Sequence, residues 1–180
     1  GGACGSWGPG PGGGGGGSGL GADGGGRLGE VARVGGEVAG VNCAKFKAIN
    51  SSALRGSGTL FYVATMTGGG ATAGTAMGVW AFDAAGNHLL LRQGDAFNES
   101  KVSSFNVLSA VAGSPGQGRG YQDGTVAVLV NFVNKTQAIM HFGPGLDPEI
   151  ISATGYFAGG PLPLPRVNPF RVPPTVAAGG

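Results

Sequence analysis

The chain has 180 residues, of which 41 are glycine and 11 are proline, and only 11% are charged. Eleven basic and nine acidic residues give a net charge of +2 and are scattered along the chain, so no basic stripe indicates a nucleic-acid partner. No apolar run reaches the length of a transmembrane segment, and two distant cysteines and two isolated histidines are too few to predict a metal site, so we expect no cofactor.

Composition divides the chain into three parts. Residues 1–27 are dominated by glycine and hold too few large side chains to bury a core, which predicts a flexible arm. Residues 28–142 contain a single proline and most of the large apolar side chains, which predicts one domain. Residues 143–180 carry eight of the eleven prolines and predict an extended tail.

Two stretches of the predicted domain resemble each other. Both follow the order Arg-x-Gly and then an apolar pair beginning with phenylalanine, without a gap and 59 residues apart: Arg33, Gly35, Phe46 and Ile49, then Arg92, Gly94, Phe105 and Leu108. Further on, "GTLFYVATM" (58–66) matches "GTVAVLVNF" (124–132), and "GVWAF" (78–82) matches "QAIMHF" (137–142). An internal period of this size predicts stacked β units, here residues 28–87 and 88–142.

Each unit is predicted to contain four short strands. Apolar and β-branched runs alternate with clusters of Gly, Asn, Asp and Ser, which is typical of strands and turns. The predicted strands are 28–34, 44–50, 58–66, 77–83, 88–93, 103–110, 124–132 and 136–142, with hairpin turns over 83–87 and at Asn134-Lys135. The fold class is therefore all-β, as two four-stranded antiparallel units that form propeller-like blades or part of a propeller.

The stretch "GSPGQGRG" (113–120) is an insertion in the second unit. Gly124 lies 19 positions after Phe105, whereas Gly58 lies 12 positions after Phe46. A phosphate-binding loop leads into a helix, whereas a predicted strand follows here, so we predict a connecting loop. Its end offers groups suited to a sugar or a partner surface, and a solvated connector remains the alternative; these residues are Arg119, Tyr121, Gln122 and Asp123.

The segment "GVWAFDAAGNHLLLRQGDAF", with the later "KVSSFNVLSAVAGSPGQGR" and "DGTVAVLVNFVNKTQAI", resembles the tandem-repeat exported proteins of Planctomycetes, Verrucomicrobia and related bacteria. Many members of that family end in a PEP-CTERM-type sorting signal, which is not expected here. The resemblance implies a β-propeller-like array on an exported protein with no established enzymatic role. The asparagine of the family motif is replaced by Arg55 and Tyr121, and two units are too few to close a propeller.

Arg33 and Arg92 are the repeated polar residues. They predict either a ligand-facing pair or contacts that hold a strand end to the next turn, and we favour the second. Asp95 follows the second arginine, but the matching position in the first unit is Gly36. His88 has no acidic partner nearby in the sequence, so a solvated or strand-capping histidine is expected, and the same holds for His141.

Cys4 and Cys43 are the two cysteines, and a disulfide tying the arm to the domain and two free thiols both remain open. The large aromatic side chains are expected in the core, above all Trp80, Phe82, Phe105 and Phe132.

Two functions fit the sequence. The first is a non-enzymatic module, secreted or at a bacterial cell surface, used for adhesion or for binding a glycan, a matrix or a surface protein. The alternative is a fragment of a propeller-type hydrolase or lyase whose active site lies outside this chain.

Overall fold

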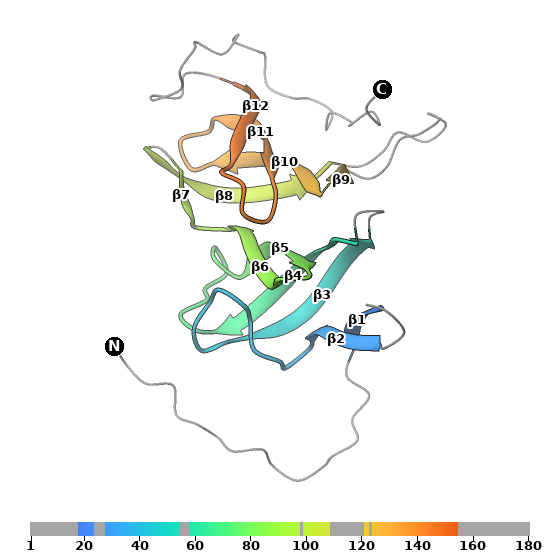
Figure 1. Ribbon diagram of the computed structural model, residues 1–180. Helices are drawn as coiled ribbons and strands as arrows, with labels where there is room; N and C mark the ends of the chain where they lie inside the picture. Colours follow the sequence, from blue (N-terminus) through green and yellow to red (C-terminus); the bar gives the residue numbers. More distant parts are fainter. Residues whose placement is uncertain are drawn as a thin grey trace.

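The computed structural model describes residues 18–23, 28–54, 58–97, 99–108, 121–122 and 124–154. These residues form twelve strands and no helix (Figure 1). All the pairings between the strands are antiparallel. The strands are β1 (Gly19–Asp23), β2 (Leu28–Arg33), β3 (Ala44–Leu54), β4 (Leu60–Gly68), β5 (Met77–Asp83), β6 (Gly86–Arg92), β7 (Ala96–Phe97), β8 (Ser100–Val107), β9 (Tyr121–Gln122), β10 (Thr125–Phe132), β11 (Gln137–Phe142) and β12 (Glu149–Ala153).

The eight strands predicted from the sequence are confirmed, as β2, β3, β4, β5, β6, β8, β10 and β11. Four further strands were not predicted. The two longer ones, β1 and β12, lie within the ranges 1–27 and 143–180 that composition assigned to an arm and a tail. The β structure therefore extends beyond residues 28–142 at both ends.

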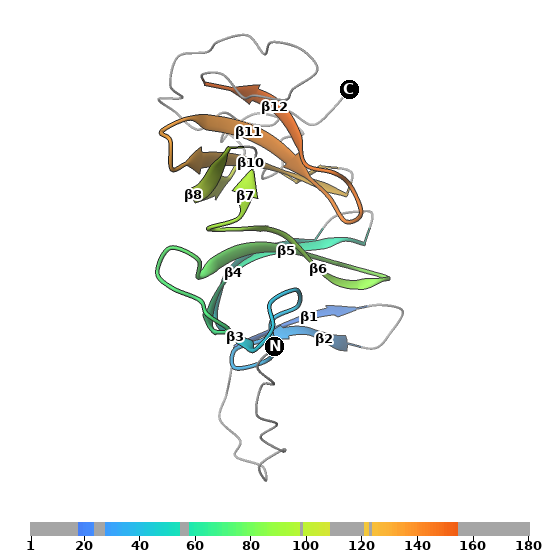
Figure 2. The ribbon, with the colours of Figure 1, turned by 90° about the vertical axis from the view of Figure 1, so that its left-hand side faces the viewer.

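The strands form three sheets that lie one above another (Figures 1 and 2). A hairpin of β1 and β2 forms the first layer, and the second is a four-stranded sheet in the order β3-β4-β5-β6. The third is a six-stranded sheet in the order β12-β11-β10-β8-β7, in which β9 also pairs with β10. Consecutive strands are neighbours in most of these pairings, so the connections stay short.

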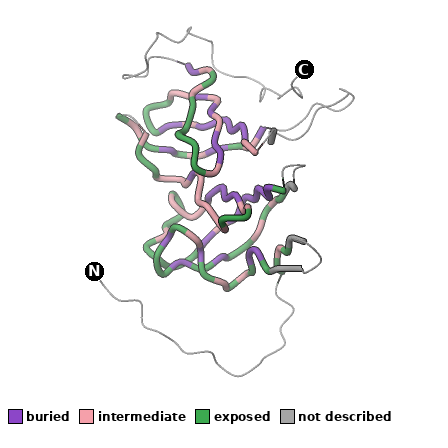
Figure 3. The backbone as a smooth tube through the Cα atoms, in the orientation of Figure 1, coloured by how far each residue is buried: buried purple, intermediate pink, exposed green. Residues whose placement is uncertain are grey.

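The four-stranded sheet is buried on both faces, which explains why β4 is a continuous apolar run. Because side chains alternate across a strand, Phe61 and Val63 face the six-stranded sheet, whereas Leu60 and Tyr62 face the β1–β2 hairpin. Figure 3 shows the buried residues following the strands of the two larger sheets. A smaller cluster of Leu108, Ala127 and Leu129 lies on the opposite face of the six-stranded sheet.

An aromatic cluster joins the hairpin layer to the four-stranded sheet. The ring of Trp80 lies 5.3 Å from that of Phe46 and 5.8 Å from that of Tyr62, centroid to centroid. Trp80 is fully buried, and its indole Nε1 donates a hydrogen bond of 3.1 Å to the carbonyl of Ala39 in the loop before β3. The buried indole N–H is thus satisfied, as burial of this side chain requires.

The turn after β2 recurs after β6. The amide of Gly36 donates to the carbonyl of Arg33 (2.8 Å), and that of Asp95 donates to the carbonyl of Arg92 (3.2 Å). The third residue of each turn is a glycine with positive φ, 85° at Gly35 and 88° at Gly94, as a type II turn requires.

In the strand that follows each turn, the residues do not correspond as the gapless alignment predicted. Phe46 exchanges hydrogen bonds with the first turn, but in the second its place is taken by Val102 and not by Phe105. The connection is three residues shorter in the second stretch, so the predicted equivalence of Phe46 with Phe105 is wrong at this point.

The hairpins β1–β2, β5–β6 and β11–β12 share one hydrogen-bonding pattern. In each, the residue just before the first pair of the ladder accepts a hydrogen bond from the amide just beyond the partner strand: Ser18 from Val34 (3.0 Å), Met77 from Gln93 (3.0 Å) and Gln137 from Thr154 (2.8 Å). In each, the register then shifts after two further residues, between Leu20 and Gly21, Val79 and Trp80, and Ile139 and Met140.

We predict that Trp80→Ala lowers the free energy of unfolding by about 3–5 kcal/mol, because it empties a fully buried site and leaves the Ala39 carbonyl without its donor. Val133→Ala, at a side chain that is 61% exposed, is the control and should change it by less than about 0.5 kcal/mol. Urea unfolding followed by circular dichroism measures both, and similar losses for the two variants would contradict this account of the core.

Candidate functional site

Each of the two arginines singled out in the sequence has a polar contact close to its own strand. Arg33 ends β2, and its exposed side chain lies 3.6 Å from the carboxylate of Glu30. Arg92 ends β6, in another sheet, and its Nε donates a 2.9 Å hydrogen bond to the carbonyl of Thr75. Arg92 thus holds the strand end to the loop between β4 and β5, and not to the turn that follows β6 as we expected.

Asp95 also has a local partner. Its Oδ2 accepts a 2.7 Å hydrogen bond from the backbone amide of Arg92, which closes the turn between them. A short polar side chain that binds the backbone three residues earlier is typical of a turn. This contact is specific to the second turn, since Gly36 occupies the matching place in the first.

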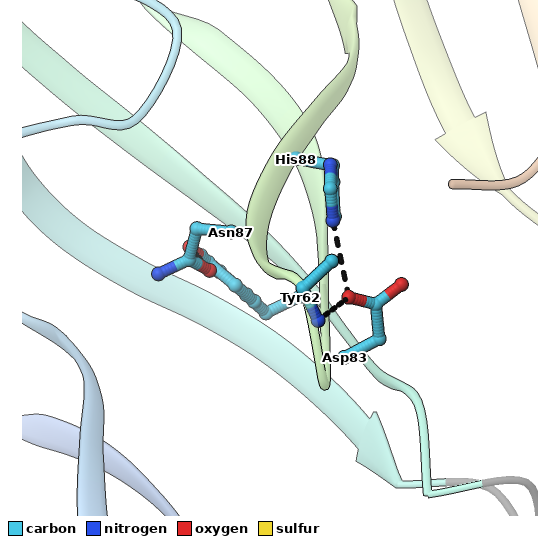
Figure 4. A network of polar contacts seen from close by, with 5 residues as sticks. Tyr62, Asp83, Asn87 and His88 are labelled. Atoms are coloured by element: carbon cyan, nitrogen blue, oxygen red, sulfur yellow. Dashed lines mark hydrogen bonds and ion pairs between the residues drawn. The ribbon is translucent and has the colours of Figure 1, made fainter. Parts of the chain in front are cut away.

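His88 does have an acidic partner, and the expectation that it has none is wrong. Its Nε2 lies 3.1 Å from Oδ1 of Asp83, across the turn between β5 and β6 (Figure 4). Asp83 pairs with Gly86 in the hairpin ladder, and His88 pairs with Ala81. The hairpin therefore brings together two side chains that are five residues apart, and a short turn between two predicted strands is the signal that could have revealed this.

The same carboxylate also organises the turn itself. Oδ1 of Asp83 accepts a 2.8 Å hydrogen bond from the amide of Ala85. Partial burial acts to raise the pKa of Asp83, but the hydrogen bonds from Ala85 and His88 and the attraction to His88 outweigh it, so this pKa lies below its ordinary value. The pair is partly exposed, with 34% of the His88 side chain and 27% of the Asp83 side chain accessible.

A second polar chain runs inward from the same hairpin (Figure 4). The hydroxyl of Tyr62 donates a 2.8 Å hydrogen bond to Oδ1 of Asn87, and Nδ2 of Asn87 donates one of 2.8 Å to the carbonyl of Val31 in β2. Burial raises the pKa of Tyr62, so its hydroxyl stays protonated as a donor. Asn87 thereby connects the four-stranded sheet to the hairpin layer.

A row of amide and hydroxyl groups crosses three strands of the six-stranded sheet. Nε2 of Gln137 donates to Oδ1 of Asn131 (2.8 Å), and Nδ2 of Asn131 donates to the hydroxyl of Ser104 (3.1 Å). These residues face each other in the ladder, Gln137 opposite Asn131 and Asn131 opposite Ser104. This row was not predicted from the sequence, because it depends on the exact register of β8, β10 and β11.

The structure describes the remaining predicted site residues only in part. Tyr121 and Gln122 form β9, which pairs with the start of β10, but their side chains lie outside what the structure describes, as do Arg119, Asp123 and the whole of "GSPGQGRG". Cys43 is disulfide-bonded and has a positive φ of 60°. Cys4 lies outside the described residues, so its pairing with Cys43 remains a prediction.

Within the described ranges, no three His, Cys, Asp or Glu side chains come close enough to hold a metal ion, and no helix suited to crossing a membrane is found. No protein-family model, curated protein or solved structure matches the chain.

We predict that Asp83→Asn lowers the melting temperature at pH 7, because a neutral amide oxygen is a weaker hydrogen-bond acceptor than the carboxylate for the amide of Ala85 and for His88. The pKa of Asp83 is depressed in the folded state, so its stabilisation is fully present above the unfolded value of about 3.9 and is lost as the pH falls through the folded value. Thermal unfolding between pH 2 and pH 8 should show the wild type and the variant converging at the acid end.

The control is Asp147→Asn, at an exposed aspartate in the turn before β12. It should leave the melting temperature nearly unchanged throughout this pH range. A difference between wild type and Asp83→Asn that persists undiminished at pH 2 would show that the aspartate charge is not what stabilises the turn.

Proposed function

We propose that the protein is a non-enzymatic extracellular or cell-surface module made of stacked β repeats, which binds a glycan, a matrix or a surface protein. The observation that carries the proposal is the shared hydrogen-bonding pattern and register shift of the hairpins β1–β2, β5–β6 and β11–β12. Unrelated hairpins have no reason to place a bulge at the same step of the ladder.

The predicted division into units 28–87 and 88–142 is wrong, because β2 pairs with β1 and β6 pairs with β5. The repeats proposed instead are two four-stranded units, β3-β4-β5-β6 and β8-β10-β11-β12, each with its strands paired in chain order. Their second strands both follow a glycine with positive φ, 81° at Gly58 and 78° at Gly124. Their first pairings also correspond, Phe46 opposite Met66 and Val102 opposite Phe132. The hairpin β1–β2 then takes the place of the last two strands of a preceding unit.

The way the sheets stack favours a propeller-like arrangement. The residues of β4 that face the hairpin layer, such as Tyr62, match the residues of β10 that face the four-stranded sheet, such as Val128. Every unit thus turns one face to the preceding layer, so the stack is head-to-tail, as blades in an array are.

The loop between β8 and β10 is the proposed ligand-binding segment, with the side chains of Arg119, Tyr121, Gln122 and Asp123. A guanidinium, an aromatic ring and amide and carboxylate oxygens are groups that bind sugars and protein surfaces. The loop follows β8 and leads into β9, which pairs with the start of β10. Because β8 and β10 are themselves held together by a longer ladder, added length in the loop leaves the sheet register intact.

The repeat architecture predicts that Gly58→Ala and Gly124→Ala cost the same. A Cβ at either position meets no atom within 4 Å, so the loss comes from the positive φ alone, about 1–2 kcal/mol each. Gly74→Ala, where space is open and φ is not in that region, is the control and should be close to neutral. Urea unfolding measures all three, and losses for the first two that differ by more than about 1 kcal/mol would argue against equivalent units.

The binding function predicts saturable binding of the full chain to a glycan array or to immobilised matrix preparations. Shortening Gly113–Gly120 to the length of the first connection should abolish that binding, as should Tyr121→Ala together with Arg119→Ala, while circular dichroism stays unchanged. Lys47→Ala, on an exposed position of β3, is the control and should bind like wild type.

Three results would count against the proposal. Undiminished binding after the deletion would remove the loop as the binding segment. Failure to bind any glycan or matrix would contradict the binding function, and turnover of a bound glycan would favour a hydrolase or lyase instead.

A further inference from the structure

The edge of β1 that faces away from β2 carries this inference, which rests on the repeat architecture proposed above. Among the described residues, β2 is the strand that pairs with β1. We infer that the other edge of β1 binds a separate extended peptide segment, which pairs antiparallel and has the sequence pattern of β4.

The register shows what kind of edge this is. The pair Gly19–Arg33 occupies the same step as Gly78–Arg92, and the bulge follows one residue later in both hairpins. β5 is an inner strand, because its other edge pairs with β4, and β11 is likewise covered by β10. β1 therefore matches strands that have a neighbour on both sides.

The backbone of Gly19 points toward the vacant side. The carbonyl of Ser18 accepts from the amide of Val34, so Ser18 faces β2, and successive residues of a strand alternate in direction. The N–H and C=O of Gly19 are thus directed away from β2. On β5 the equivalent residue is Gly78, which lies opposite Ala64 of β4.

β1 has few of the features that protect natural sheet edges. Its sequence, GLGAD, contains no proline or lysine and has one charge, at its end. By contrast, the outer edge of β3 is covered by residues 35–38, where Glu37 bridges to Lys45 and the amide of Val38 donates to Ala44. The outer edge of β8 is covered by β7, through Ala96 opposite Lys101.

The partner that fits this edge is an extended segment that is apolar on both faces and carries a small residue opposite Gly19. Addition of a strand to an exposed edge gains affinity from backbone hydrogen bonds and specificity from alternate side chains. The sequence of β4 fits this description, since Ala64 stands at the step that would face Gly19 and is flanked by Tyr62 and Met66 on one side of the strand and by Val63 and Thr65 on the other.

The test uses the full chain and a fluorescent peptide with the sequence of residues 58–68, flanked by lysines for solubility. We expect saturable binding by fluorescence anisotropy. Gly19→Pro removes the amide on the vacant edge and should weaken binding roughly fivefold or more. Gly19→Ala keeps the amide, and its Cβ meets only the Ala32 carbonyl at 3.5 Å, so this control should bind like wild type.

A peptide in which proline replaces the residue corresponding to Ala64 lacks the amide that would reach Gly19, and it should bind as weakly as the variant. This second arm does not depend on how well Gly19→Pro folds. Equal binding of all variants and both peptides, or no binding by the unmodified peptide, would overturn the inference. If that happens while Gly58→Ala and Gly124→Ala still cost the same, the edge assignment fails and the repeat architecture stands.

Discussion

Burial of the four-stranded sheet on both faces is the constraint on which the other layers depend. Its central strands carry Phe61 and Val79 toward the six-stranded sheet and Tyr62 and Trp80 toward the β1–β2 hairpin, all of them buried. A two-stranded hairpin is marginal in water by itself, so β1–β2 is stable here because it covers the aromatic face of its neighbour. The six-stranded sheet gains its core from the opposite face of the same strands.

Polar groups fix the positions of the layers that apolar burial holds together. Burial is not directional, whereas the hydrogen bond from Asn87 to Val31 requires one relative placement of the hairpin layer and the sheet. The hydrogen bond from Trp80 to Ala39 likewise fixes the loop between β2 and β3 against the sheet. Within the sheet, the contact of Arg92 with Thr75 fixes the loop between β4 and β5. Arg92, one of the two repeated arginines, thus serves the geometry of its own sheet.

Much of the strand structure could be predicted because apolar runs and turn residues alternate along the chain. The strand β1 could not be predicted, because Gly19 and Gly21 have no side chains and so show no alternation of apolar and polar residues. Its position is set by pairing with β2 and by the packing of Leu20. The strand β12 was not predicted because it lies in the proline-rich C-terminal part of the chain. The contact between Asp83 and His88 depends on the two-residue turn of the hairpin, which sets the cross-strand register more finely than strand limits alone.

The stack also restricts where recognition can occur. Both faces of β3–β6 and the inner face of the six-stranded sheet are used in packing, and the amides of Asn131 and Gln137 on the outer face bind one another. Among the described residues, the side chains that pair at a hairpin tip, Asp83 and His88, likewise use their hydrogen bonds within the turn. A protein that uses its sheet faces in this way has loops and strand edges left for contact with other molecules. Of these, the loop between β8 and β10 and the edge of β1 that faces away from β2 are the two that we propose as recognition sites.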